Sequence, residues 1–342
     1  MRVRRNRNVL AITVGQAVNT LGQAITGVTL TLRLHATGHS GWWIAAMLLA
    51  EMLPMVVLSP LTGLLADRHD AKRLLLVASL WESAMCVLLA YVVSPLATVA
   101  VVALFATASA LAMPVFATMV PRTVERDQLP RAYALVQTAI GFTGIVGPAI
   151  GGVLAGMLGY QWPLLVQAVT ALGITVVALV VRLGPRENGD PADQGADRTG
   201  GGRALDGARV LLRDRPLAAA VLLVLAIIVA LEAFGVAEVF LVRDVLGGGE
   251  QAYGLAGAMW AAGALLGSAL VGRVRGDATM VRSIPAACAG AAAMILCVSV
   301  VPSLGWLYPP YVLAGIANGW VNTAFAAVIP MRVPGSMLGR VS

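Results

Sequence analysis

Long apolar segments alternate with short polar gaps along almost the whole chain. Ten of these segments have roughly the 20 residues that an α-helix needs to cross the hydrocarbon core of a bilayer. They lie at Val9–Leu32, Trp42–Leu65, Leu74–Val93, Ala97–Val120, Ala132–Leu158, Leu164–Val181, Leu217–Leu241, Ala252–Val271, Ile284–Val301 and Leu304–Ile329. The pattern predicts an all-α membrane protein with ten transmembrane helices.

The basic residues fall on one side of these segments. Of the 24 Lys and Arg residues, all but Arg33 and Arg243 lie in every second gap or at the chain ends. Cytoplasmic loops carry such an excess, so both termini are expected in the cytoplasm, with the protein in the plasma membrane. The net charge of +7 then indicates contact with anionic membrane lipid and makes nucleic acid an improbable partner.

Composition excludes an ordinary soluble domain, because 58% of the residues are hydrophobic and only 12% are charged. The three cysteines, Cys86, Cys288 and Cys297, lie inside apolar segments without ligand spacing, so neither a metal nor a disulfide is expected. No phosphate-binding loop and no nucleophile with a base stand out. We therefore expect neither a cofactor nor an enzymatic activity. We also expect the protein to be a monomer.

One long polar gap divides the chain. Residues 183–216 are rich in Gly, Pro, Asp and Arg and predict a cytoplasmic linker between an N-terminal six-helix half, residues 1–182, and a C-terminal part, residues 217–342. An offset of 209 residues superimposes four matching pairs: Ser59 on Ser268, Gly63 on Gly272, Pro121 on Pro330 and Arg131 on Arg340. This duplication predicts twelve helices, so the second half is expected to be incomplete, with four of six.

The stretch Gly63-Leu64-Leu65-Ala66-Asp67-Arg68-His69-Asp70-Ala71-Lys72-Arg73 resembles the G-x-L-a-D-R-x-x-R-K-x signature of the major facilitator superfamily. Ala71 stands where a first basic residue is usual. The resemblance implies a close helix approach at Gly63. It also implies a conformational latch at the cytoplasmic mouth, made by Gly63, Asp67, Arg68, Lys72 and Arg73.

A second motif lies in the fifth predicted span and resembles the glycine and proline motif of exporters in that superfamily. It consists of Gly144, Gly147, Pro148, Gly151 and Gly152. Its glycines should let a neighbouring helix approach closely, and Pro148 permits a bend. Gly and Pro are also generally enriched in membrane helices, which is the alternative reading. The fourth span has no arginine, so the chain most resembles the enterobactin-exporter and macrolide-efflux branch.

Four carboxylates lie within predicted spans, where a charge is costly and needs an explanation. Glu232, central in the seventh span, is the first candidate for proton coupling. Glu51 is the second candidate, and for it a role in proton or substrate binding and a buried structural hydrogen bond are equally favoured. For Glu82 a structural hydrogen bond is favoured. Glu238, near Arg243, is interpreted as part of an external salt-bridge gate or as a hydrated residue.

The first span carries a polar stripe made by Gln16, Asn19, Gln23 and Thr26, spaced three and four residues apart. One helix face with this polarity cannot point at lipid without cost. It is expected to line a substrate cavity, with hydrogen bonds to a partner helix as the alternative.

These observations lead to one functional hypothesis with two rivals. The chain is expected to be a proton-coupled exporter of small amphipathic compounds, of drug or siderophore type, working by alternating access. The first rival is a truncated membrane protein that does not transport, either a remnant or an assembly partner. The second is an uptake porter, which would accumulate the compound that an exporter removes.

The predicted topology can be tested by cysteine labelling in intact cells. In a variant without native cysteines, a cysteine at Gly201 in the linker should react with an impermeant maleimide only after permeabilisation, because the linker is predicted to be cytoplasmic. A cysteine at Gly159, in an opposite gap, should react without it. External labelling at Gly201 would overturn the topology.

Overall fold

The computed structural model describes residues 6–38, 40–124, 128–181, 229–230, 232–271 and 277–332. The chain divides into two compact units. Unit 1 comprises Met1–Pro185 and Val236–Ala258, and unit 2 comprises Arg186–Gly235 and Met259–Ser342. The described residues are overwhelmingly helical and contain no strand, so the all-α prediction is confirmed.

The helices of unit 1 lie on the predicted apolar segments and extend a few residues beyond most of them. They are α1 (Arg7–Ala36), α2 (Gly41–Arg68), α3 (Ala71–Tyr91), α4 (Pro95–Met119), α5 (Leu129–Leu158) and α6 (Gln161–Val180). Among the described residues, six helices are long and apolar enough to cross a membrane, namely α2 to α6 and the helix at Glu250–Val271. The count of ten spanning helices stays a prediction, since the seventh predicted span lies largely outside the described residues.

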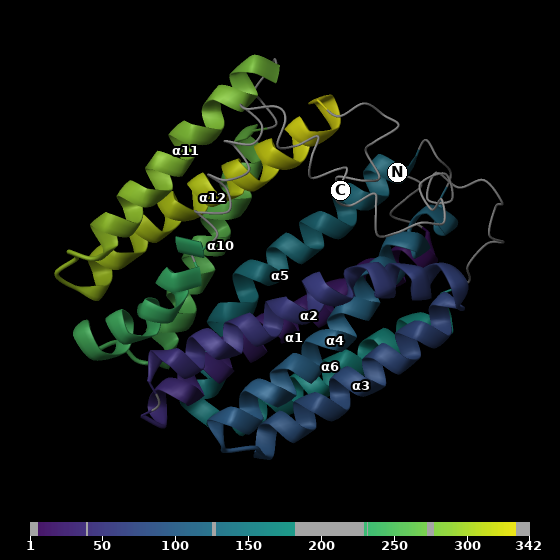
Figure 1. The fold of residues 1–342 in the computed structure, drawn as a ribbon, viewed down its shortest axis with the longest axis horizontal. Helices are drawn as coiled ribbons and strands as arrows, with labels where there is room; N and C mark the ends of the chain where they lie inside the picture. Colours follow the sequence, from purple (N-terminus) through teal and green to yellow (C-terminus); the bar gives the residue numbers. More distant parts are fainter. Residues whose placement is uncertain are drawn as a thin grey trace. The chain divides into compact units, whose positions relative to one another are not determined.

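Helices distant in sequence pack side by side in unit 1 (Figure 1). Helix α1 lies against α5 and α6, α2 against α4, and α3 against both α4 and α6. The polar stripe therefore lies on a helix whose other faces pack against neighbouring helices. This packing gives the stripe a defined place within the bundle.

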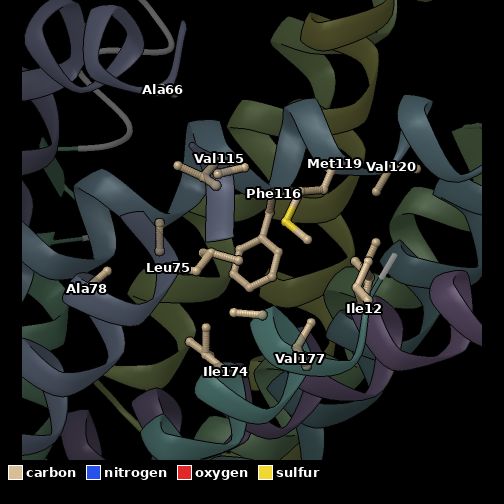
Figure 2. Close-up of a cluster of buried hydrophobic side chains, with 14 of the residues drawn as sticks. Ile12, Ala66, Leu75, Ala78, Val115, Phe116, Met119, Val120, Ile174 and Val177 are labelled. Atoms are coloured by element: carbon tan, nitrogen blue, oxygen red, sulfur yellow. The ribbon is translucent and has the colours of Figure 1, made fainter. Parts of the chain in front are cut away.

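The main apolar cluster of unit 1 surrounds Phe116 of α4, whose side chain is 5% exposed. Figure 2 shows Leu75 of α3, Ile12 of α1 and Val177 of α6 directed toward the same interior. The outer faces are apolar as well: Val56 is 71% exposed and Val169 is 69% exposed. Apolar residues both inside and outside are what a bundle immersed in lipid requires.

Side-chain caps fix two helix starts. The Asn6 carboxamide oxygen accepts from the backbone N–H of Asn8 at 3.0 Å, and its nitrogen donates to the Thr123 carbonyl at 2.7 Å. Asp70 caps α3 by accepting from the Arg73 backbone N–H at 3.0 Å. Both caps satisfy donors that the first helical turn leaves without partners.

In unit 2, glycines bring two helices into backbone contact. Helix α10 (Glu250–Val271) and α12 (Leu304–Arg332) meet at Gly263 and Gly267 on one side and Gly315 and Gly319 on the other. A Cβ built on Gly319 would lie 2.8 Å from the Cα of Ala264. Small residues let membrane helices approach this closely.

Helix α11 (Asp277–Val298) completes the described part of unit 2 and packs along α12. The Trp320 indole N–H of α12 donates to the Ser283 hydroxyl of α11 at 2.8 Å. At the 209-residue offset, α11 and α12 correspond to α3 and α4, which also pack together in unit 1. The repeat seen in the sequence therefore recurs as a repeat of helix contacts.

Replacing Gly319 with alanine should destabilise unit 2. The new methyl group would overlap the backbone of α10 at Ala264, and overpacking of this kind costs about 1–3 kcal/mol. Thermal unfolding of the purified protein in detergent measures the effect. Gly290→Ala on α11 is the matched control, because nothing among the described residues lies within 4 Å of its Cβ position. Equal unfolding midpoints for the two variants would contradict the close contact.

Candidate functional site

The polar stripe of α1 contains buried oxygens that have no hydrogen-bond partner in the described part of the chain. They are Oε1 of Gln16, Oδ1 of Asn19 and Oγ1 of Thr26. Asn19 is 8% exposed and Thr26 is 3% exposed. Buried polar atoms are normally paired with protein, water or ligand, so a row of unpaired acceptors suits a surface that binds something.

Gln23, the fourth member of the stripe, is held by two neighbours. Its Nε2 donates to Oε1 of Glu82 at 3.2 Å and to the Ser109 hydroxyl at 3.0 Å. These partners come from α3 and α4, so the stripe is tied to helices that α1 otherwise touches little. Gln23 thus makes the hydrogen bonds to partner helices that the sequence offered as the alternative, and the substrate cavity stays a prediction.

Glu82 is fully buried, with 0% of the residue exposed. Its Oε1 accepts a second hydrogen bond from Nε2 of Gln167 on α6 at 2.9 Å, and Oε1 of Gln167 accepts from the Thr170 hydroxyl at 2.7 Å. The structural role favoured for Glu82 agrees with these bonds. Sequence reasoning missed Gln167 and Ser109, although an amide in the middle of an apolar span, as at Gln167, was a usable signal.

The two candidates for proton coupling belong to different units. Glu51 lies in the middle of α2 in unit 1 and is partly buried. Glu232 lies in unit 2, on the helical residues 232–240, and is exposed. Proton coupling by either carboxylate stays a prediction.

The glycine and proline motif of α5 forms two close helix contacts within unit 1. A Cβ on Gly147 would lie 2.6 Å from the Ala24 Cβ of α1, and one on Gly151 would lie 3.1 Å from the Ile25 Cα. On another side of α5, a Cβ on Gly152 would lie 2.9 Å from the Gly254 Cα of α10. The motif therefore removes the side chains that would separate α5 from both helices.

Pro148 takes part in the second of these contacts. A Cβ on Gly257 of α10 would lie 3.0 Å from the Pro148 side chain. Gly144 differs from the rest of the motif. Among the described residues no atom lies within 4 Å of its Cβ position, so the close approach at Gly144 stays a prediction. Packed helices cross and then diverge, and Gly144 lies one turn before the closest point.

The motif after α2 runs from the end of α2 into the start of α3. Among the described residues the Cβ position of Gly63 has no neighbour within 4 Å, so the close approach at Gly63 stays a prediction. Asp67 and Arg68 lie in the last turn of α2, and Lys72 and Arg73 in the first turn of α3. The sequence interpretation overlooked Asp70, which caps α3 between them. The latch stays a prediction.

Charged residues cluster where α1 ends and α10 begins, all within unit 1. Arg243 pairs with Glu250 at 3.0 Å, and Nε2 of His35 lies 3.0 Å from Oδ1 of Asp244. The Tyr160 hydroxyl donates to Glu250 at 3.4 Å. Burial raises the pKa of Tyr160, the Glu250 charge acts in the same direction, and Arg243 opposes it. Glu238 was interpreted from the sequence as part of an external salt-bridge gate near Arg243 or as a hydrated residue. The structure pairs Arg243 with Glu250, and the gate stays a prediction.

Comparisons with known proteins agree with this architecture. A family model described as Major Facilitator Superfamily matches residues 12–342. Macrolide efflux protein A of Streptococcus pyogenes is 26% identical over 178 residues, which cover 50% of this chain and 43% of that protein. An uncharacterised transporter of the same type, YfiS of Bacillus subtilis (strain 168), is 21% identical over 99% of this chain and 82% of its own length.

Solved structures show the same fold. A mutant of the nucleoside transporter NupG superimposes with a TM-score of 0.78 at 15% identity, covering 98% of this chain and 87% of that one. An inward-facing bacterial homologue of the human lysosomal transporter Spinster gives 0.71 at 16% identity, covering 98% and 79%. A D-xylose-proton symporter gives 0.66 at 13% identity, covering 99% and 85%.

The family match and the fold shared with solved transporters point to a membrane transporter, not an enzyme. The chain belongs to the major facilitator superfamily, as its match over residues 12–342 shows. The fold and family resemblances inferred from the sequence are therefore confirmed. The matched stretch spans less than half the length of the macrolide efflux protein.

The contact between α5 and α10 predicts a contrast inside one motif. Gly152→Ala should destabilise the folded protein by about 1–3 kcal/mol, because its methyl group meets the α10 backbone at Gly254. Gly144→Ala, two turns earlier on the same helix, should be neutral or slightly stabilising, because its Cβ position is open. Unfolding midpoints in detergent compare the two. A loss at Gly144 as large as that at Gly152 would refute the assigned contacts.

Proposed function

We propose that the protein is a secondary active transporter that exports small amphipathic compounds in exchange for protons. The observation that carries this proposal is the geometry of the α5 motif. Its glycines bring α5 onto α1, the helix with the polar stripe, and onto α10. A motif of this kind is typical of exporters in the superfamily, and the similarity to a macrolide efflux protein supports the same direction of transport.

The stripe formed by Gln16, Asn19, Gln23 and Thr26 is proposed as the substrate surface. Its unpaired oxygens are supporting evidence, since a compound that supplied hydrogen bonds would satisfy them. First helices of each half line the pathway in transporters built from repeats. Binding there would replace contacts that are now missing, and so would be favourable.

Glu232 and Glu51 are proposed to carry the coupling proton. A carboxylate at membrane depth is costly, so a group that takes up and releases a proton there has a functional reason to exist. Asp67 and Arg68, together with Gly63, Lys72 and Arg73, are proposed to set the balance between inward-facing and outward-facing states. The halves at residues 1–182 and 217–342, joined by the linker at 183–216, would rock against each other.

The basic residues support an orientation with both termini in the cytoplasm of a plasma-membrane protein. Contacts with anionic lipid follow from the same charges. We propose a monomer as the working form. Export therefore moves the compound from the linker side to the side of Gly159.

The test uses proteoliposomes with an imposed pH gradient and two probes, ethidium and erythromycin. Wild-type protein should move both probes against their gradients only while the proton gradient lasts. Glu232→Gln combined with Glu51→Gln should abolish movement of the probes against their gradients, because neither amide can carry the coupling proton. Asp193→Asn, a carboxylate of the predicted linker, is the control and should leave transport unchanged.

Other outcomes would separate the rival functions. Movement that ignores the gradient and survives both substitutions would remove proton coupling. Accumulation in the direction opposite to export would identify an uptake porter. Failure to move either probe, by a protein that elutes as a folded species, would favour the membrane protein that does not transport.

A further inference from the structure

A hydrogen-bond network centred on one carboxyl group joins four helices of unit 1. Glu82 on α3 accepts hydrogen bonds from Gln23 on α1 and Gln167 on α6, and Gln23 also donates to Ser109 on α4. All of these bonds lie deep in the bundle, far from the chain's loops in sequence. The function proposed above uses Gln23 but gives Glu82 no part.

The surroundings of Glu82 fit a neutral carboxylic acid. The side chain is fully buried, and its Oε2 has no partner in the described part of the chain. Both donors to Oε1 are uncharged amides, and no described lysine, arginine or histidine bonds to it. The nearest ionisable group on α3 is Cys86, one turn away. An ionised carboxylate without a cation is strongly disfavoured in such an interior, so the proton stays on.

The hydrogen bond to Glu82 determines whether Gln23 can donate a hydrogen bond to a ligand or only accept one. The amide nitrogen has two hydrogens, and one goes to Glu82 while the other goes to Ser109. Its donor capacity is therefore used up. The remaining polar atom, Oε1, accepts nothing from the described residues and can only act as an acceptor.

Gln23 is the member of the stripe restricted in this way. Gln16, Asn19 and Thr26 each leave a side-chain oxygen unpaired within the described residues, but the amide nitrogens of Gln16 and Asn19 and the hydroxyl of Thr26 can also donate. A group of a ligand that contacts Gln23 therefore meets an acceptor only. Acceptors select partners that donate, because a partner without N–H or O–H groups leaves them unsatisfied.

We propose that Glu82 is a neutral positioning residue that holds Gln23 as an acceptor, and that the transported compounds bear hydrogen-bond donors. Amines and hydroxyl-rich amphipathic molecules form this class. The inference rests on the proposed function for the role of the stripe. It goes beyond that function because it assigns Glu82 a part in specificity and narrows the substrate class.

Binding of two lipophilic cations to the purified protein tests the proposal without relying on transport. Ethidium carries N–H donors and tetraphenylphosphonium carries none. Glu82→Leu should weaken ethidium binding about three- to tenfold, the worth of one neutral hydrogen bond, and leave tetraphenylphosphonium binding unchanged. Glu82→Gln should bind ethidium like the wild type, because its amide oxygen still accepts from both glutamines.

Two controls separate positioning from general damage. Ser79→Ala breaks a buried 2.7 Å bond to Thr175 between the same helices, α3 and α6, and should leave both affinities unchanged. In the Gln23→Leu background, Glu82→Leu should weaken ethidium binding no further, because Glu82 acts through Gln23. Additive losses, or a Glu82→Gln variant as weak as Glu82→Leu, would overturn the positioning role.

Infrared spectroscopy tests the protonation state directly. The wild type should show the C=O stretching band of a protonated carboxylic acid at neutral pH, and the band should disappear in Glu82→Gln but persist in Ser79→Ala. Its absence from the wild type would refute the neutral acid. Equal affinity of the wild type for both cations, or no binding of ethidium, would refute the donor-bearing substrate class. Expected binding without proton-driven movement would instead refute only the proposed export.

Discussion

Inside a bilayer there is no water to satisfy a polar group, so each buried donor or acceptor must find its partner within the protein or in a ligand. This constraint explains why the chain is built from helices, which satisfy their own backbone. It also makes the few polar side chains of the interior informative. In unit 1 those side chains come together around Gln23 and Glu82, and the α1 stripe is where acceptors are left over. The candidate site therefore lies where buried polar atoms lack a hydrogen-bond partner among the described residues.

The lipid environment also determines how the helices pack against one another. Lipid gives apolar side chains no reason to prefer the protein interior, so close contact between helices depends on fit. The described helices achieve that fit with glycine, as between α5 and α1 at Gly147 and Gly151, between α5 and α10 at Gly152 and Gly254, and between α10 and α12 at Gly267 and Gly315. Large apolar side chains such as Phe116 fill the wider space between α3, α4 and α6. Small and large residues therefore have separate tasks in this bundle.

Apolar length predicted the helices of unit 1 to within a few residues, because a hydrophobic span leaves the backbone no alternative to helix. Helix ends were less predictable: α1 runs to Ala36 and α3 begins at Ala71, where the caps and turns, and not hydrophobicity, set the boundary. The stripe on α1 was visible as a three- and four-residue spacing. Its partners were not, because the pairing of Gln23 with Glu82 depends on which helices pack together, and periodicity within one helix holds no information on that. For the same reason the sequence does not distinguish Gly147 and Gly151, which contact α1, from Gly144 and Gly63, which have no neighbour within 4 Å among the described residues.

Helix α10 has glycines at two levels along its axis. Gly254 and Gly257 contact α5, and Gly263 and Gly267 contact α12. Because backbone meets backbone at these positions, a side chain of any size would force the helix axes apart. Substitutions that a membrane helix tolerates on its lipid-facing side would therefore separate α10 from its neighbours.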